Sequence, residues 1–331
     1  MKNQIHRNLF PILRQLSDCN FHSGPSLAAA LGLSRTSVFN VISQAETLGI
    51  SIYAVRGKGY KLAESIEWMD ANKVTNGLGD VAHAYEIRMS DYEASTNATL
   101  MKTALSSAVD GSVLCAEHQY AGKGRRGRQW LSVLGGSLTF SVLLRFERGL
   151  QSMGGLSLVA GMAVARAVNR HSRHPARLKW PNDILVGYRK LAGILVEVQG
   201  DMNGSAFAIV GVGLNVRLSD AQREGIDQGV IDLAEMGVTV GRNQLLVDCL
   251  RELHVTLNIF REQGFSALRD EWMAMDAYSG KEVSLLLPNT LAVHGVDCGV
   301  DDTGALLLSD GNATPTAYSG GEISLRLRTH E

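Results

Sequence analysis

Apolar residues recur along the middle of the chain with two different periods. Positions three and four residues apart are apolar over 156–167 and again after Asn243, which predicts two amphipathic helices, and 95–108 also has a helical pattern. Apolar residues at 138, 140, 142 and 144 alternate with polar residues at 137, 139 and 141, which predicts a strand. Because helices and strands alternate from about residue 83 to about residue 275, we expect one central α/β domain there.

The first sixty residues have a different pattern, which predicts short helices followed by a hairpin. Leu27, Ala30 and Leu31 form a helical stripe, Gly32 marks a turn, and Ser34 can cap a second helix that runs toward Leu48. This is the spacing of a helix-turn-helix. Residues 52–62 then predict a strand, a glycine turn and a returning strand, which together give a winged helix-turn-helix over residues 1–63.

The pattern of apolar residues changes again toward the C-terminus. Short apolar runs over 281–327 are separated by the turn sequences 301–304 and 310–312, which favours a small barrel of five or six strands. The predicted fold is therefore an α+β multidomain protein with a winged helix-turn-helix at 1–63, a polar linker at 64–82, a central α/β domain at 83–275 and a small β-barrel at 276–331.

Composition narrows the range of partners. The 331 residues are 45% hydrophobic, and 32 Lys plus Arg against 33 Asp plus Glu leave a net charge of -1, so any DNA binding must depend on a local patch. No apolar run approaches the roughly 20 residues that span a bilayer, and the start does not resemble a signal sequence. The four cysteines lack C-x-x-C spacing, so we expect free thiols and a cytoplasmic protein.

The helix-turn-helix offers polar residues to a DNA duplex. The predicted DNA-binding residues are Arg35, Thr36, Ser37, Asn40 and Gln44 on the second helix, with Arg56 and Lys58 at the hairpin tip. Arg35 is the only cation on that helix, so the helix itself attracts DNA phosphates only weakly. A small packing domain with a solvated hairpin is the alternative interpretation.

A basic glycine loop at 122–130, Gly-Lys-Gly-Arg-Arg-Gly-Arg-Gln-Trp, is the clearest chemical signal. Its glycines allow close approach to a ligand, and its cations suit phosphate and carboxylate oxygens. The spacing G-x-G-x-x-G also fits a dinucleotide-binding turn, but that turn must open a helix, whereas the residues that follow alternate like a strand. The sequence therefore argues against a Rossmann fold.

Several motifs occur in an order that resembles biotin-protein ligases. They are Ser95-Thr96-Asn97, the loop 122–130, Lys-Trp-Pro-Asn-Asp at 179–183, Arg-Lys-Leu-Ala-Gly-Ile-Leu-Val-Glu at 189–197, Gly-Val-Gly-Leu-Asn at 211–215 and Gly-Gly-Glu-Ile-Ser-Leu-Arg at 320–326. With the N-terminal helix-turn-helix, the chain most resembles the bifunctional bacterial ligases that also repress biotin synthesis genes. In that family the C-terminal domain is SH3-like.

The resemblance implies a reaction and a set of site residues. Biotin and ATP would give biotinyl-5′-adenylate and pyrophosphate, and the biotinyl group would pass to a lysine of the biotin carboxyl carrier protein of acetyl-CoA carboxylase. The implied catalytic residues are Lys190, Arg125 and Asp183. Biotin would contact Ser95, Thr96, Asn97, Gln119, Lys123, Gly124, Arg125 and Lys190. The nucleotide would contact Arg126, Arg128, Trp130, Lys179, Asn182, Asn215, Glu322 and Arg326.

Further expectations follow from the resemblance. Mg²⁺ is expected with the ATP phosphates and keeps most of its waters, so no dedicated metal site is predicted, although Asn215 is a candidate ligand. Lysine at 123, where relatives more often have arginine, predicts looser retention of the adenylate. Ligand binding is expected to promote a homodimer that binds operator DNA, with the strand 193–199 as an edge for pairing. A lipoate- or octanoate-transferring enzyme and a non-catalytic biotin-sensing repressor stay as alternatives.

Overall fold

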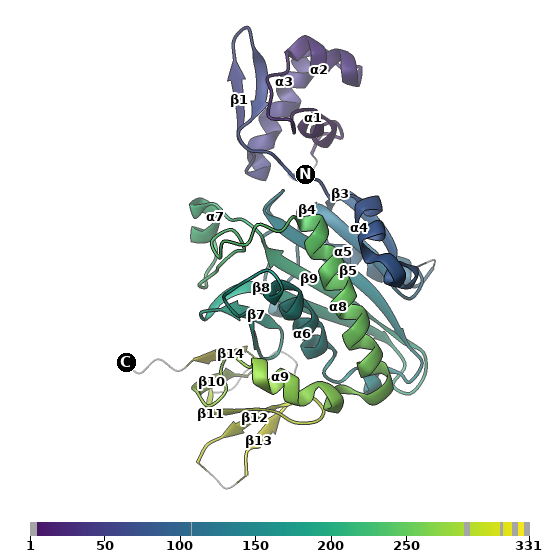
Figure 1. Ribbon diagram of the computed structural model, residues 1–331, viewed down its shortest axis with the longest axis vertical. Helices are drawn as coiled ribbons and strands as arrows, with labels where there is room; N and C mark the ends of the chain where they lie inside the picture. Colours follow the sequence, from purple (N-terminus) through teal and green to yellow (C-terminus); the bar gives the residue numbers. More distant parts are fainter. Residues whose placement is uncertain (1–4, 107, 288–291, 312–313, 320–323, 328–331) are drawn as a thin grey trace.

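The computed structural model describes residues 5–106, 108–287, 292–311, 314–319 and 324–327. Figure 1 shows three parts stacked along the long axis: an N-terminal unit from α1 to β2, a central unit from α4 to α9 and a C-terminal unit from β10 to β14. The mixed α and β content confirms the predicted fold class. The sequence-based domain boundaries stay a prediction.

The N-terminal unit contains the predicted helix-turn-helix and wing. Its elements are α1 (Leu9–Gln15), α2 (Gly24–Leu31), α3 (Arg35–Ile42), the 3-10 helix η1 (Ser43–Leu48), β1 (Ile52–Val55) and β2 (Gly59–Leu62). Gly32 ends α2 in the left-handed region with φ 63°, and the Ser34 hydroxyl caps α3 by accepting from the amide of Ser37. The second helix was expected to continue to Leu48, but it tightens after Ile42, where the hydroxyls of Ser43 and Thr47 donate to backbone carbonyls.

The segment 64–82, which we expected to be a linker, is in large part a packed helix. Asp70 caps α4 (Ala71–Leu78), and η2 (Gly79–Ala84) follows it. Val74 and Leu78 are fully buried in the main hydrophobic core, one turn apart on the face that meets α8. Because the residues between them are polar or glycine, two apolar positions were too few to predict a helix from the sequence.

The central unit is a seven-stranded mixed sheet in the order β3-β4-β5-β9-β8-β7-β6, of which only β3 and β4 are parallel neighbours among the described strands. The strands are β3 (Glu86–Glu93), β4 (Ser112–Gln119), β5 (Ser137–Phe146), β6 (Arg177–Lys179), β7 (Asp183–Val186), β8 (Arg189–Gly200) and β9 (Ala206–Asn215). All ten residues of β9 are buried, because the sheet is covered on both faces.

Helices complete the core of the central unit. They are α5 (Thr96–Ala104), α6 (Leu156–Asn169), α7 (Asp220–Glu224), α8 (Arg242–Gln263) and α9 (Arg269–Met275), with the 3-10 turns η3 (Arg125–Gly127), η4 (Leu150–Met153) and η5 (Phe265–Leu268). The helices α6 and α8 pack against each other on one face of the sheet (Figure 1). Both were predicted from their apolar stripes, as was strand β5.

The C-terminal unit is a five-stranded antiparallel sheet in the order β13-β12-β11-β10-β14. Its strands are β10 (Glu282–Leu286), β11 (Val293–Val300), β12 (Leu306–Ser309), β13 (Thr316–Tyr318) and β14 (Ser324–Leu327). This agrees with the expected small β domain. Trp180 of the central unit is buried and donates from Nε1 to the Gly304 carbonyl at 3.0 Å, so the two units are joined beside the motif 179–183.

Candidate functional site

The site begins with one large cavity at the ends of the central strands. Its volume is about 1200 Å³, and its walls come from the loop 120–132, the start of α5, β7, β8 and β9. Arg326 of the C-terminal unit and Gln44 of the N-terminal unit also line it. All three parts of the chain therefore contribute to one pocket.

The basic glycine loop forms one wall of the cavity as a short closed turn. Gly124 donates to the Arg128 carbonyl at 2.7 Å, and Trp130 donates to the Gly122 carbonyl at 2.9 Å. Arg126 has φ 59° in the three-residue helix η3, and the chain then enters strand β5. Since no long helix begins at this loop, the structure agrees with the rejection of a Rossmann fold.

Two glycines of the motif 211–215 allow side chains to fill the floor of the cavity. A Cβ on Gly213 would lie 2.4 Å from the indole ring of Trp130, and a Cβ on Gly211 would lie 2.2 Å from Oδ1 of Asn97. Both contacts are shorter than real atoms tolerate. The motif is therefore required for Trp130 and Asn97 to pack onto strand β9.

At one end of the cavity, a carboxylate lies between two lysines. Lys190 Nζ is 2.6 Å from Asp183 Oδ1, and Lys179 Nζ is 3.6 Å from Asp183 Oδ2. The antiparallel pairing of Lys179 with Asp183 and of Leu185 with Lys190 brings the three side chains together. Each side chain is less than one fifth exposed, so water screens these charges only weakly.

Burial affects the ionisation of the cations at this end. Burial lowers the pKa of Lys179, the nearby Asp183 carboxylate opposes that change, and Lys190 adds to it. Burial also lowers the pKa of Arg125, which donates from Nη1 to Asn182 Oδ1 at 3.1 Å. These groups are cations with incomplete solvation, a state suited to stabilising anionic oxygens.

At the other end, small polar side chains form a continuous chain of hydrogen bonds. The Thr96 amide donates to Gln119 Oε1 at 2.7 Å, and Thr96 Oγ1 lies 2.6 Å from Ser141 Oγ. Ser141 donates to Asn97 Oδ1 at 2.6 Å, and Asn97 donates to Glu197 Oε2 at 2.8 Å. The structure thus brings together the predicted residues Thr96, Asn97 and Gln119, and Ser95 precedes them as the buried N-cap of α5.

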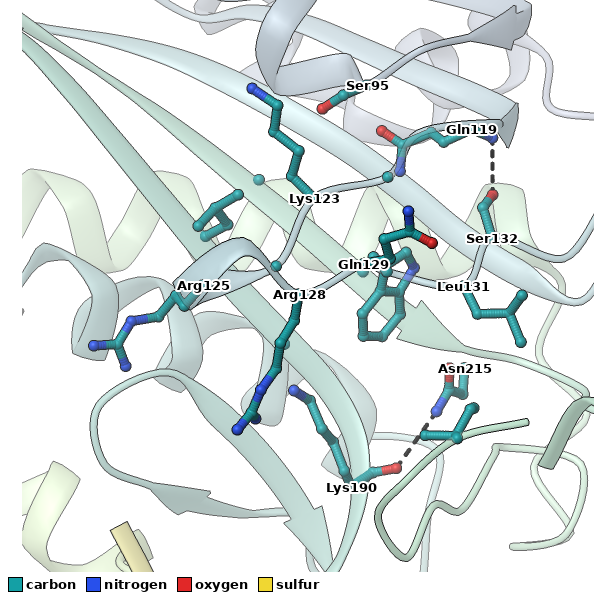
Figure 2. Close-up of a pocket in the computed structure, with 18 of the residues that line it drawn as sticks. Ser95, Gln119, Lys123, Arg125, Arg128, Gln129, Leu131, Ser132, Lys190 and Asn215 are labelled. Atoms are coloured by element: carbon teal, nitrogen blue, oxygen red, sulfur yellow. Dashed lines mark hydrogen bonds between the residues drawn. The ribbon is translucent and has the colours of Figure 1, made fainter. Parts of the chain in front are cut away.

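Sequence reasoning missed Ser141 and Glu197. Ser141 lies on the polar side of the alternating pattern of β5, and Glu197 ends the motif 189–197. The sequence shows both residues in these patterns, but it does not show that they lie next to each other in the fold. Glu197 also lies near the basic loop, with Oε1 3.9 Å from Lys123 Nζ. Figure 2 shows Lys123 directed toward the Ser95 end of the pocket and Arg128 toward the Lys190 end.

The remaining predicted ligand contacts are placed as follows. Gly124, Arg126, Arg128 and Trp130 line the cavity with the rest of the loop. Asn215 is buried and donates from Nδ2 to the Ile231 and Lys190 carbonyls at 3.2 and 3.4 Å, so it supports the backbone at Lys190 (Figure 2). Arg326 lines the cavity from β14. Glu322 lies outside the described residues.

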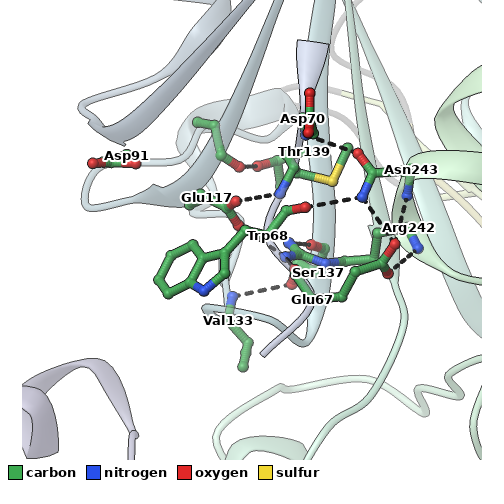
Figure 3. A network of polar contacts seen from close by, with 12 residues as sticks. Glu67, Trp68, Asp70, Asp91, Glu117, Val133, Ser137, Thr139, Arg242 and Asn243 are labelled. Atoms are coloured by element: carbon green, nitrogen blue, oxygen red, sulfur yellow. Dashed lines mark hydrogen bonds and ion pairs between the residues drawn. The ribbon is translucent and has the colours of Figure 1, made fainter. Parts of the chain in front are cut away.

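A buried ion pair supports the strand that ends at Gln119. Arg242 Nη2 lies 2.9 Å from Glu117 Oε2, and both side chains are 2% exposed. Figure 3 shows Glu67 and Asn243 in the same network, which connects the start of α8 to the segment before α4. The Met69 amide donates to Glu117 Oε1. The network therefore fixes strand β4 to the segment that leads from the N-terminal unit.

The predicted DNA-binding residues lie on two surfaces. Arg35, Thr36 and Asn40 are exposed on α3, and Arg56 and Lys58 are exposed on the turn between β1 and β2. Ser37 is half-buried, with its hydroxyl 2.8 Å from that of Ser34. Gln44 is also half-buried: its Oε1 accepts from the His6 amide, and it lines the large cavity.

The sequence predicted free cysteine thiols and no membrane-spanning segment, and the structure bears on both points. All four cysteines, Cys19, Cys115, Cys249 and Cys298, are free. Among the described residues, none of the helices has both the length and the apolar character needed to cross a membrane.

Comparisons with known proteins agree with this geometry. Residues 91–215 match the biotin/lipoate A/B protein ligase family, residues 8–61 match a helix-turn-helix domain, and residues 278–326 match the biotin protein ligase C-terminal domain. The chain is 36% identical to the bifunctional ligase/repressor BirA of Salmonella typhimurium over 316 residues, 95% of this chain and 96% of that one.

Other similar proteins align with only part of this chain. The biotin-[acetyl-CoA-carboxylase] ligase of Mycobacterium tuberculosis is 37% identical over 70% of this chain and 86% of that one. Among solved structures, the biotin protein ligase of Aquifex aeolicus in complex with biotin and ATP superposes with a TM-score of 0.62 and 29% identity, covering 73% of this chain and 99% of that one.

Proposed function

The chain belongs to the family of bifunctional biotin-protein ligases and repressors, and from that premise we propose that its large cavity activates biotin with ATP and transfers it to a protein lysine. The observation that carries this proposal is the Asp183 carboxylate held between Lys190 and Lys179 at one end of the cavity. The uncharged side chains of Thr96, Asn97 and Gln119 line the other end. A neutral cyclic urea suits the polar end, and phosphate suits the cationic end.

In the first step, a carboxylate oxygen of biotin attacks the α-phosphorus of ATP. The bond from that phosphorus to the β-phosphate oxygen breaks, and pyrophosphate leaves. Negative charge accumulates on the oxygens around the α-phosphorus, and Lys190 and Arg125 stabilise it as incompletely solvated cations. The cavity-lining residues Arg126, Arg128, Lys179 and Arg326 would contact the nucleotide, and Lys123 and Gly124 would contact biotin. Trp130 lies beside Lys190, whose Nζ is 5.9 Å from the centre of the indole ring.

In the second step, a neutral lysine amine of the acceptor attacks the acyl carbon of the adenylate. A C–N bond forms, the bond to the phosphate oxygen breaks and AMP leaves. The role proposed for Asp183 is to accept a hydrogen bond from the incoming amine, orient it, and take up the proton that the nitrogen loses as the C–N bond forms. Asn182 is held by Arg125 and donates to the Ile194 carbonyl, so it supports the backbone beside Asp183.

Magnesium would arrive with the ATP phosphates and reduce their charge. The described side chains offer it little direct ligation, because the amide oxygen of Asn182 accepts from Arg125 and the Asp183 carboxylate lies between two lysines. Asn215 is buried with its amide nitrogen on backbone carbonyls. Phosphate oxygens and water would therefore supply most of the magnesium ligands.

The N-terminal unit gives the chain its second role, as a biotin-responsive repressor of biotin synthesis genes. Its exposed residues on α3 and on the wing, Arg35, Thr36, Asn40, Arg56 and Lys58, would contact operator DNA. Adenylate binding would promote a dimer, and strand β8 has the required edge: β7 pairs only as far as Gly193, and Val196 to Gly200 pair with β9 alone among the described strands. A cytoplasmic location is expected, since ATP, acceptor and operator are all found there.

The test of the ligase is ATP-dependent transfer of labelled biotin to a biotin carboxyl carrier domain, with lipoate as the competing substrate. The proposal expects transfer of biotin and at least a hundredfold weaker binding of lipoate. Preference for lipoate would establish the lipoate-transferring alternative. Sedimentation with and without biotin plus ATP tests the dimer, and a monomer at micromolar concentration under both conditions would contradict it.

A further inference from the structure

Helix α3 presents a large aromatic side chain to solvent. Phe39 is 60% exposed, although Val38, Val41 and Ile42 on the same helix are buried in the N-terminal core. Its neighbours on the exposed face are Thr36 and Asn40. Single exposed apolar side chains are common on protein surfaces, so Phe39 matters here for its place on the outer face of the second helix of the helix-turn-helix.

The N-terminal unit that carries Phe39 is rich in positive charge. Residues 1–63 contain seven Lys and Arg against two Asp and Glu, a net charge of +5, whereas residues 64–331 hold 25 against 31. The ion pairs within or from the described part of this segment are Arg14–Asp91 and His22–Asp18. Arg35, one turn before Phe39, and Arg56 and Lys58 on the wing therefore have no carboxylate partner in the described structure, and their charge complements DNA phosphates.

We propose that Phe39 is a specificity-determining residue that contacts the C5-methyl group of a thymine in the major groove. This inference rests on the proposed repressor function and adds to it. In a helix-turn-helix the second helix enters the major groove, where thymine alone among the bases presents a methyl group. An exposed phenyl ring gains from covering that methyl, and the adjacent Asn40 amide can hydrogen-bond a neighbouring adenine.

The experiment uses the full chain with biotin and ATP. Preferred duplexes are selected from a random pool, and each thymine in the selected site is then replaced by uracil, which removes the methyl and keeps the hydrogen-bonding edge. For the unmodified protein we expect one or two positions per half-site where uracil weakens binding by about fourfold, the value of one buried methyl group. For Phe39→Ala those positions should become insensitive to uracil, and Phe39→Tyr should retain the sensitivity.

Two controls separate this contact from general effects. Leu105→Ala truncates another exposed apolar residue, 68% exposed on the central unit, and should leave the uracil response unchanged. The salt dependence of binding to a non-selected duplex should be the same for Phe39→Ala and the unmodified protein, because that slope reports phosphate contacts.

The possible failures are distinguishable. Selective DNA binding that is insensitive to uracil at every position, or equally sensitive in Phe39→Ala, would overturn the role of Phe39 and leave the repressor function intact. Failure to select any sequence, with biotin transfer intact, would overturn the repressor function and this inference together. A change in oligomeric state caused by Phe39→Ala, without a change in the uracil response, would mean that the side chain meets protein rather than DNA.

Discussion

The Lys190 ammonium lies 2.6 Å from one oxygen of Asp183, and Lys179 lies 3.6 Å from the other oxygen. A single half-buried carboxylate thus balances two cations, in a cavity that the proposed reaction requires to accept anions as well. When phosphate enters, the lysines gain a second anionic partner, and Asp183 becomes available to an incoming amine. In the proposed reaction, the two half-reactions would therefore depend on the same three side chains in different ways.

The first prediction separates the two steps at Asp183. Asp183→Asn retains the shape of the side chain but removes the charge that would hold the acceptor amine. We expect transfer from preformed adenylate to slow by about a hundredfold, within the usual range for a lost general base. Adenylate formation should slow much less. Single-turnover measurements of both steps check this, and equal losses would show that Asp183 serves only to arrange the lysines.

The second prediction concerns the contact between the basic loop and strand β8. Glu197→Gln removes the charge opposite Lys123, whose Nζ lies 3.9 Å away, and should speed adenylate release by about two- to fivefold, the scale of an exposed ion pair. Lys123→Arg should slow release, since a guanidinium can pair with both carboxylate oxygens. In the double variant Lys123→Gln with Glu197→Gln, the effects should not add. Additive effects would mean that the two residues act separately.

The third prediction is a pH dependence of stability at the junction with the C-terminal unit. Burial raises the pKa of Asp297 to about 7, with a contribution from nearby Asp276, whose own pKa is raised to about 6. The folded protein holds these protons more tightly than the unfolded chain. Their contribution to stability is therefore full below about pH 4 and is lost as the pH rises to about 7.

The substitution Asp297→Asn tests this sign. The amide oxygen can still accept from the Gly299 amide, as Asp297 Oδ1 does at 2.7 Å. Relative to the unmodified protein, the variant should gain roughly 4 kcal/mol in the free energy of unfolding between pH 4 and pH 8, since about three pKa units separate folded and unfolded Asp297. Denaturant unfolding at several pH values measures this, and a difference that stays constant with pH would refute it.

The fourth prediction concerns the buried ion pair of Figure 3. Glu117→Ala leaves Arg242 buried without its carboxylate and should lower the free energy of unfolding by about 3 kcal/mol. Glu64→Ala is the matched control, because Glu64 pairs with Arg217 on the surface at 73% exposure and should cost less than about 1 kcal/mol. Similar losses for both variants would mean that burial of the Arg242 pair has no special effect.

The sequence predicted those parts of the molecule that depend on local pattern. The stripes of α6 and α8, the alternation of β5 and the cap at Ser34 all follow from residues a few positions apart. The motifs also predicted the residues that line the cavity, because each motif fixes the local backbone. The exact contacts did not follow, since Ser141, Asn97 and Glu197 meet only after distant strands pair.

Helix α4 shows why part of the fold was not predicted. Its two buried residues, Val74 and Leu78, make too short a stripe to identify, and only packing on α8 reveals their role. The hydrogen bond from Trp180 to Gly304 is a similar case. From sequence alone, a tryptophan in the motif 179–183 could belong to the hydrophobic core or to the ligand site, and nothing in the neighbouring residues indicates a bond to the C-terminal unit. Long-range contacts decided both cases.

The most direct test of the proposed ligase is biotin-dependent exchange of pyrophosphate into ATP, with Lys190→Ala beside the intact protein. The exposed residue Lys281 gives the matched control, Lys281→Ala. The account predicts biotin-dependent exchange by the intact protein and by the control, and a loss of about a hundredfold or more in Lys190→Ala, comparable to removing one group that stabilises transition-state charge. Exchange by Lys190→Ala at nearly the rate of the intact protein would contradict the proposed role of Lys190. Biotin binding without exchange in the intact protein would contradict the ligase itself and favour a non-catalytic biotin-sensing repressor.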